Sequence, residues 1–156
     1  MNILEINNLV KDFGGLRAVD ALSLSIKEGE ILGMIGPNGA GKSTAFNCIA
    51  GVYAPTKGDI FFAGKKINGV KPWNLCKNGL ARTFQIVKPF PTISVLDNVM
   101  VGALSREKST AGATKKSLEI IDFFGLSKWT HTEAQELPLP LRKRLEMARA
   151  HAAAGW

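Results

Sequence analysis

The sequence predicts an α/β protein with a β-rich N-terminal lobe and a second lobe that is mostly helical. Three observations support this: short or alternating apolar runs fill residues 3–35, a glycine-rich loop joins the last run to a helix, and helical spacing prevails from about residue 71. With 156 residues, of which 46% are hydrophobic, the chain is long enough to bury a core of its own. We therefore treat residues 1–156 as one domain of two lobes.

Strands are expected in the first lobe at residues 3–6, 22–26, 31–35 and 59–64. Residues 22–26 alternate strictly between apolar and polar, which is typical of a half-buried strand. Turns at Gly14-Gly15 and at residues 27–30 separate the first three runs, the second turn as a tight, hairpin-like connection. A helix closed by Gly51 follows the glycine-rich loop.

The second lobe is expected to hold a short strand at residues 80–84 and helices at 73–77, 96–104, 115–124 and 141–154. The third helix carries Leu118, Ile121 and Phe124 at helical spacing and should end at Gly125. The last helix contains strong helix formers and no breaker before Gly155.

The loop that enters the first helix carries the clearest chemistry. Its glycines let the backbone wrap closely around a polyphosphate, because they have no Cβ atom. Lys42 adds a charge for the outer phosphates, Ser43 a hydroxyl for Mg²⁺, and the helix that begins near Gly41 directs its positive dipole end to the same place. A plain glycine-rich turn would need neither Lys42 nor Ser43. The loop therefore predicts binding of a nucleoside triphosphate by Gly36, Pro37, Asn38, Gly39, Ala40, Gly41, Lys42, Ser43 and Thr44.

Composition excludes several other classes. The net charge of +7 is spread along the chain apart from residues 142–144, so nucleic acid is not expected as a partner. Cys48 and Cys76 lack metal-ligand spacing and are expected to be free thiols in a reducing compartment. No apolar run approaches the roughly eighteen residues of a membrane span, and residues 1–5 do not begin like a signal peptide. We expect the chain in the cytosol.

Several segments together resemble one family, the ATP-binding subunits of ABC transporters, over nearly the whole chain. Residues 9–20 resemble its N-terminal strand and adenine-stacking loop, which implies that Phe13 stacks on the adenine of ATP; a core or turn aromatic is the alternative. Residues 79–85 resemble its strand and Gln loop, which implies that Gln85 contacts Mg²⁺ and the attacking water. The resemblance implies a P-loop NTPase fold with an antiparallel β lobe and a helical subdomain, and ATP and Mg²⁺ as cofactors.

The segment after Gln85 looks most like the subunits of branched-chain amino acid importers. This resemblance implies that transmembrane permease subunits dock between Gln85 and Leu96, with Pro89, Phe90 and Pro91 as docking residues. An ordinary apolar loop packed on its own lobe is an equally open alternative. The family also implies a homo- or heterodimer with another nucleotide-binding subunit, located at the inner face of the cell membrane.

The signature segment of the family, typically LSGGQ and a basic helix, aligns here with residues 137–150. The helix matches, but Pro138, Leu139 and Pro140 replace the Ser-Gly-Gly part. In the family this part contacts the γ-phosphate held by the partner subunit. Because two prolines remove two N–H donors and Leu139 adds bulk, we expect weak phosphate binding by this segment.

Two catalytic elements of the family have no match in the sequence. No Asp-Glu pair closes an apolar run, and His131 and His151 lie at the wrong positions for the family's switch histidine, His131 being expected at the surface. The tail at 150–156 looks like a premature end or a frame change. These departures predict an incomplete core sheet, a strand at 31–35 without partners, and a marginally stable or aggregation-prone monomer.

The sequence is therefore identified as a truncated nucleotide-binding domain, with a β-rich lobe at 1–70, a mainly helical subdomain at 71–135, and an altered signature helix and tail at 136–156. We expect an ATP-binding component of an importer, with binding but negligible hydrolysis. A non-hydrolysing regulatory or decoy module and the product of a broken gene are the alternatives. A GTPase is disfavoured because no Asn-Lys-x-Asp segment occurs.

Overall fold

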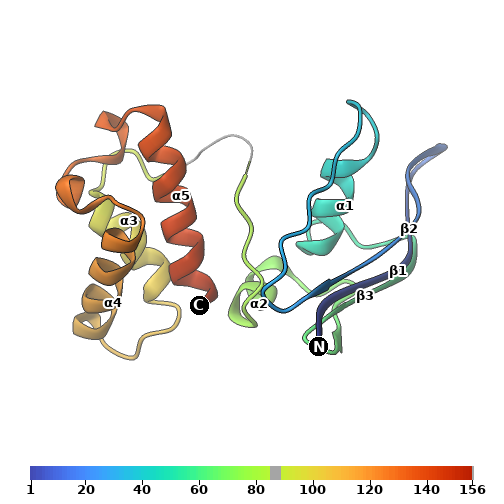
Figure 1. The fold of residues 1–156 in the computed structure, drawn as a ribbon, viewed down its shortest axis with the longest axis horizontal. Helices are drawn as coiled ribbons and strands as arrows, with labels where there is room; N and C mark the ends of the chain where they lie inside the picture. The colour runs from blue at the N-terminus through green and yellow to red at the C-terminus, as the bar shows by residue number, and fades with distance from the viewer. Residues whose placement is uncertain (85–88, 156) are drawn as a thin grey trace. The chain divides into compact units, whose positions relative to one another are not determined.

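The computed structural model describes residues 1–84 and 89–155, which form parts of two compact units, Met1–Leu75 and Cys76–Trp156. The first unit runs from blue to green in Figure 1 and the second from green to red. Each unit has its own buried apolar side chains, so each is described by itself.

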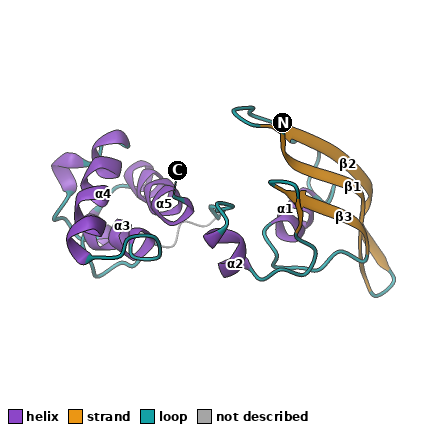
Figure 2. Cartoon of the chain, turned by 90° about the horizontal axis from the view of Figure 1, so that it is seen from below, coloured by secondary structure: helices purple, strands orange, loops and turns teal. Residues whose placement is uncertain are grey.

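The first unit is built on a four-stranded antiparallel sheet with strand order β2-β1-β3-β4. Figure 2 shows β2, β1 and β3 side by side in that order. Its strands are β1 (Asn2–Phe13), β2 (Leu16–Lys27), β3 (Lys57–Phe62) and β4 (Lys65–Lys66). The central strand β1 pairs Ile6 with Leu24 on one side and with Ile60 on the other. Gly14, with φ +56°, makes the turn between β1 and β2. The predicted turn and three of the predicted strands are confirmed, the first two as longer strands.

Two short helices follow in the chain, α1 within this unit and α2 across its C-terminal boundary. Helix α1 (Lys42–Ile49) buries Ala45 and Cys48 and contacts β2, and burial raises the pKa of the Cys48 thiol. Helix α2 (Pro72–Lys77) begins at a proline and buries Leu75. A Cβ atom on Gly51 would lie 2.3 Å from the Val70 carbonyl oxygen, so only glycine fits where the chain leaves α1. Both predicted helices of this region are confirmed.

The strand predicted at residues 31–35 is wrong. These residues are assigned to no strand, and Ile31 and Ile35 are 97% and 96% exposed. An apolar strand of this kind pairs on both edges in a buried sheet, and the described residues offer it no pairing partner. The predicted hairpin-like connection at 27–30 is therefore a turn at the end of β2, but residues 31–35 form no strand after it. The strand predicted at 80–84 is wrong for the same reason, because the described residues there make no ladder.

The second unit is a helical bundle of α3 (Val95–Ala103), α4 (Thr110–Phe123) and α5 (Leu139–Ala154), with single 3₁₀ turns at Ser127–Trp129 and Ala134–Glu136. Its core is apolar and includes Val99, Ile121, Leu126, Leu137 and Leu145. The predicted helices are confirmed, although α4 begins five residues early because Ser109 caps it through the Gly112 N–H group. Leu118, predicted to line its apolar face, is 43% exposed.

Helix α5 packs closely on α3. A Cβ atom on Gly102 would lie 2.6 Å from the Arg149 carbonyl oxygen, so the two helices approach at a glycine. The alanine-rich segment at 150–154 forms the last turn of α5, with Ala152 and Ala154 buried. The Arg106 guanidinium donates to the Ala153 carbonyl at 3.0 Å and so satisfies one of the last carbonyls of the helix. Within the described residues no helix is long and apolar enough to cross a bilayer.

Candidate functional site

The glycine-rich loop at 36–44 ends on the first turn of α1. Gly41 caps this helix with φ +80°, a conformation that favours glycine. A Cβ atom on Gly41 would lie 2.0 Å from the Ala18 carbonyl oxygen of β2. The start of α1 therefore rests directly on β2, and this approach is possible only because residue 41 has no side chain.

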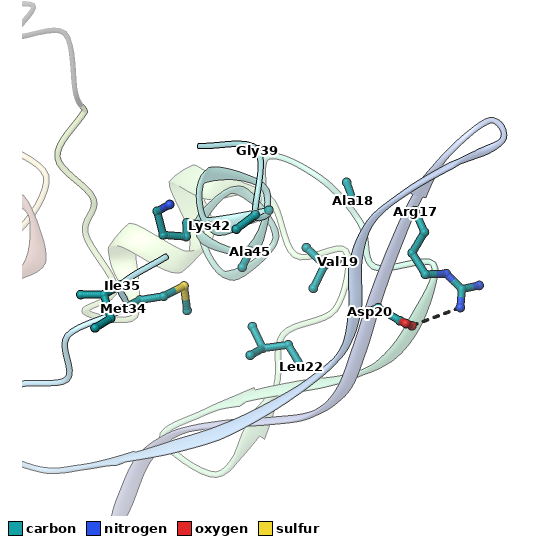
Figure 3. A pocket seen from close by; sticks show the side chains of 12 residues that line it. Arg17, Ala18, Val19, Asp20, Leu22, Met34, Ile35, Gly39, Lys42 and Ala45 are labelled. Carbon is teal, nitrogen blue, oxygen red and sulfur yellow. Dashed lines mark hydrogen bonds and ion pairs between the residues drawn. The ribbon is translucent and has the colours of Figure 1, made fainter. Parts of the chain in front are cut away.

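Lys42 folds back over the loop. Its ammonium group donates to the carbonyl oxygens of Gly36 and Pro37, both at 2.6 Å. The Ala40 N–H group also donates to Pro37, at 3.3 Å, which curls the loop into a turn. The positive charge of Lys42 is thus held beside the N-terminus of α1 (Figure 3).

The N-terminus of α1 is open to an anion. No side chain caps it, and no acidic residue lies in its first turn, so its positive dipole end meets no protein carboxylate there. Ser43 is exposed on the same turn. Among the described residues no three His, Cys, Asp or Glu side chains gather into a metal site. A magnesium ion at this loop would rely on Ser43, the phosphates and water.

A hollow of about 510 Å³ opens beside the loop, within the size range of small-molecule pockets (Figure 3). It combines the charge of Lys42 with apolar side chains from β2 and α1. The residues that line it are Arg17, Ala18, Val19, Asp20, Leu22, Met34, Ile35, Gly39, Ala40, Gly41, Lys42 and Ala45. The glycine loop and β2 thus form two walls of one cavity.

The β2 residues that line this hollow were not predicted from the sequence. Arg17 pairs with Asp12 at 3.0 Å and with Asp20 at 3.1 Å, and its pKa is raised chiefly by the hydrogen bond to Asp12. All three side chains are solvent-accessible, so the pairs contribute little stability. The contact between Ala18 and Gly41 joins residues far apart in the chain, and no local spacing signals it.

Phe13, predicted to stack on adenine, lies at the end of β1 and is 42% exposed. Its ring meets Tyr53 edge-on, with centroids 5.2 Å apart, and the Lys11 ammonium lies 4.9 Å from its centroid. Phe13 is not among the residues that line the hollow. Tyr53 follows α1, and no pattern in the sequence pairs it with Phe13.

The remaining predicted residues lie in the second unit. Gln85 falls outside the described residues. In the signature segment, Leu137 is buried, Leu139 is 58% exposed, and α5 begins directly after Pro138. The Arg142 guanidinium donates to the carbonyl oxygens of Leu137 and Gln135, at 2.6 and 2.9 Å.

The two histidines differ in their surroundings. His131 is exposed, as predicted. His151 lies against two aromatic rings, stacked on Phe123 with centroids 6.0 Å apart and edge-on to Phe124 at 5.8 Å. Burial, assisted by the positive charge of Lys116, lowers the pKa of His151.

Comparisons with known proteins agree with the phosphate-loop architecture. The family model described as "ABC transporter" matches residues 19–154. A high-affinity branched-chain amino acid transport ATP-binding protein, LivG of Salmonella typhimurium, is 35% identical to this chain, and the match covers 94% of this chain and 64% of that protein. The corresponding protein BraF of Pseudomonas aeruginosa is 33% identical, over 94% of this chain and 64% of its own length.

Solved structures of ABC cassettes are also similar to this chain. The ADP conformation of MJ1267, described as an ATP-binding cassette of an ABC transporter, has a TM-score of 0.87 and 32% identity over 98% of this chain and 65% of its own. The dimeric cassette MJ0796 has a TM-score of 0.84 and 27% identity, over 96% and 69%. The chain belongs to the ABC transporter family, and its predicted P-loop α/β fold is confirmed. It spans 64% of the length of the Salmonella relative and so corresponds to part of a cassette.

Proposed function

We propose that this chain supplies the nucleotide-binding loop of an ATP-binding subunit in an importer of branched-chain amino acids. The observation that supports the proposal best is the Lys42 ammonium, held at 2.6 Å from two loop carbonyls beside the uncapped start of α1. The loop would receive the phosphates of ATP through its N–H groups and the N-terminus of α1. Lys42 would exchange its carbonyl contacts for contacts with the outer phosphates.

Magnesium fits the same place. Bound Mg²⁺ neutralises part of the phosphate charge, and the Ser43 hydroxyl would be the contribution of the loop to its coordination. Gln85 stays a predicted contact to Mg²⁺ and water, and Phe13 a predicted stacking partner for adenine. Stacking would use the ring face that Lys11 does not occupy, or would displace Lys11 from it.

The proposed partners follow from the relatives, two of which are named as branched-chain amino acid transport ATP-binding proteins. We propose that transporter membrane subunits dock near Gln85 to Leu96, and that a second nucleotide-binding subunit forms a dimer with this one. The chain would then work at the inner face of the membrane.

Binding is tested by titrating the purified chain with ATP in the presence and absence of Mg²⁺, using calorimetry. Lys42→Ala should weaken binding about a hundredfold, because a charged contact to phosphate is worth roughly 2–3 kcal/mol. Lys65→Ala is the matched control, since Lys65 is an exposed lysine of the same unit. Equal ATP affinity in wild type and Lys42→Ala would contradict the proposal.

A non-hydrolysing regulatory module is the second candidate function. The prolines at the start of α5 favour it, because they remove N–H donors where the family's signature segment contacts phosphate. Phosphate release measured beside ATP binding separates the two candidates: binding without turnover favours the regulatory module, and Lys42-dependent turnover favours the transport ATPase.

A further inference from the structure

Three side chains of the first unit meet at the end of β1. The Lys11 ammonium lies over the Phe13 ring, 4.9 Å from its centroid, and over the Tyr53 ring, 6.0 Å from its centroid. The two rings meet edge-on, with centroids 5.2 Å apart and an interplanar angle of 82°. Because the faces of aromatic rings carry partial negative charge, the cation and the two rings attract one another.

Lys11 and Tyr53 leave one face of the Phe13 ring free of both. If they lay on opposite faces of this ring, their separation would approach the sum of 4.9 and 5.2 Å, about 10 Å. Their actual separation of 6.0 Å places Tyr53 beside the ring and not across it from Lys11. Phe13 is also 42% exposed. A flat base can therefore stack on the face opposite Lys11 without displacing the ammonium group.

Hydrogen bonds fix Lys11 and its strand to the segment that follows α1. The Lys11 ammonium donates to the Ala54 carbonyl at 3.0 Å. The Thr56 N–H group donates to the Val10 carbonyl at 2.8 Å, and the Asp12 N–H group donates to the Thr56 hydroxyl at 2.9 Å. The charge of Lys11 is thus held on its side of the ring by contacts on both sides of it in the chain.

The same segment connects the Phe13 ring to the helix that begins at the phosphate loop. The N–H groups of Val52 and Tyr53 donate to the Asn47 carbonyl of α1, at 2.9 and 3.2 Å. The residue before Phe13 also pairs at 3.0 Å with Arg17, which lines the hollow. The position of the ring relative to the phosphate loop is therefore set by α1 and the residues that follow it.

The charge of Lys11 favours stacking on the opposite face of the ring. Two stacked aromatic systems repel each other where their negative faces meet. A cation on one face of Phe13 draws this charge toward itself, so less of it faces a base on the other side. The edge contact with Tyr53 keeps the ring from turning, and a ring of fixed orientation loses little conformational entropy when a ligand binds.

We propose that Lys11 and Tyr53 are positioning residues that hold the Phe13 ring and keep its opposite face open for the base of a nucleotide. Lys11 strengthens the stacking through its charge, and Tyr53 sets the orientation of the ring. Neither residue touches the base, so each acts only through Phe13. The inference rests on the proposed function, because a nucleotide bound at the phosphate loop is what brings a base to this ring.

Calorimetric titrations with ATP and with inorganic triphosphate, both with Mg²⁺, separate the base contact from the phosphate contacts. Lys11→Met removes the charge and keeps an unbranched side chain, so ATP binding should weaken about two- to fivefold, the scale of an exposed cation–π contact. Triphosphate binding should change no more than in Lys65→Met, the control for loss of one exposed positive charge of this unit. Lys11→Arg keeps a cation and should restore the ATP affinity.

NMR of bound ATP, at saturating concentration, tests the orientation of the ring. Stacking on Phe13 should move the H2 and H8 signals of adenine upfield, because the face of an aromatic ring shields nearby protons. Tyr53→Leu should reduce this upfield shift and weaken ATP binding about two- to fivefold, as expected for loss of an aromatic pair. Tyr53→Phe keeps the edge-on ring and should restore both. Triphosphate binding should be the same in all three proteins.

Each role can be overturned separately. An equal ratio of ATP affinity to triphosphate affinity in wild type and Lys11→Met would overturn the role of Lys11. An unchanged adenine shift in Tyr53→Leu would overturn that of Tyr53. Wild-type chain that binds ATP without any upfield shift of adenine would refute both roles while leaving the proposed phosphate site intact. A chain that binds neither ATP nor triphosphate would refute the proposed function, and both roles with it.

Discussion

Helices α1 and α5 both begin in a loop without a side-chain cap, yet the two helix starts offer an anion very different surroundings. The start of α1 has glycine at its cap and Lys42 folded beside it. The start of α5 has Pro138 at its cap and Pro140 in its first turn, and Pro140 has no N–H group. The Leu141 and Arg142 N–H groups both donate to the Pro138 carbonyl, at 3.0 and 3.1 Å.

The position of the positive charge also differs between the starts of α1 and α5. The Lys42 ammonium lies over the loop in front of α1, whereas the Arg142 guanidinium is engaged by the carbonyls of Leu137 and Gln135. A helix dipole alone therefore does not make a phosphate site. The N–H groups in front of the helix and a cation beside them decide whether it can act as one.

Gly41→Ala should have the largest effect, because it breaks the start of α1. Its Cβ atom would lie 2.0 Å from the Ala18 carbonyl at a φ of +80°, so β2 and α1 would have to separate. We expect the first unit to lose about 3 kcal/mol of stability and the chain to lose ATP binding. Thermal denaturation and calorimetry measure the two effects.

Gly39→Ala is the control for this prediction. Its φ is +85° but the space around it is open, so a loss of about 1 kcal/mol of stability is expected. Equal losses in both variants would show that the contact with Ala18 is unimportant.

Phe13→Ala tests whether the site at α1 extends to an aromatic ring. Loss of stacking should weaken ATP binding about tenfold, or roughly 1.4 kcal/mol, with little effect on binding of inorganic triphosphate. Fluorescence titration of both ligands measures this difference. Tyr53→Leu, which removes the edge-on neighbour of Phe13, should have a smaller effect. If triphosphate binding falls as much as ATP binding, Phe13 acts through the fold and does not contact the base.

Restoring Ser-Gly-Gly at Pro138, Leu139 and Pro140 would convert the start of α5 toward that of α1. The variant regains two N–H donors, so phosphate should shift the amide NMR signals of residues 139–142, with a gain of a few-fold in affinity worth about 1 kcal/mol. Wild type should show no such shifts. An equal response of the two proteins would mean that the prolines do not control anion binding there.

His151, near the C-terminal end of α5, should have the smallest effect, which is on the pH dependence of stability. Its pKa is lowered in the folded chain, so the unfolded state takes up a proton first as the pH falls. The contribution of His151 is complete above its unfolded value of about 6.5 and is lost as the pH falls through the lower folded value. Because the ring is only partly buried, we expect less than about 1 kcal/mol. Urea denaturation between pH 8 and 5 measures this loss, and His151→Gln should flatten it. An unaltered slope in His151→Gln would assign the pH dependence to other groups.

Local patterns predicted most elements, because their causes are local. The loop at 36–44, the turn at Gly14 and the end of α4 near Gly125 follow from glycine conformations and helical spacing. The prediction that Leu118 lies on the buried face of α4 was wrong, since the packing of α4 on α3 and α5 decides which face is buried. No sequence pattern predicted that Asn98 and Glu146 hydrogen-bond to backbone groups, because each is a lone polar residue whose backbone partners are set by the bundle.

The sequence by itself determined that a lysine and a run of glycines stand before a helix, because that chemistry is written in consecutive residues. It also determined that prolines stand before α5. Only the tertiary structure decided that Ala18 of β2 lies directly against Gly41. The physical reason is that hydrogen bonding between strands and close packing join residues far apart in the chain, and their free energy is realised only when both partners are in place.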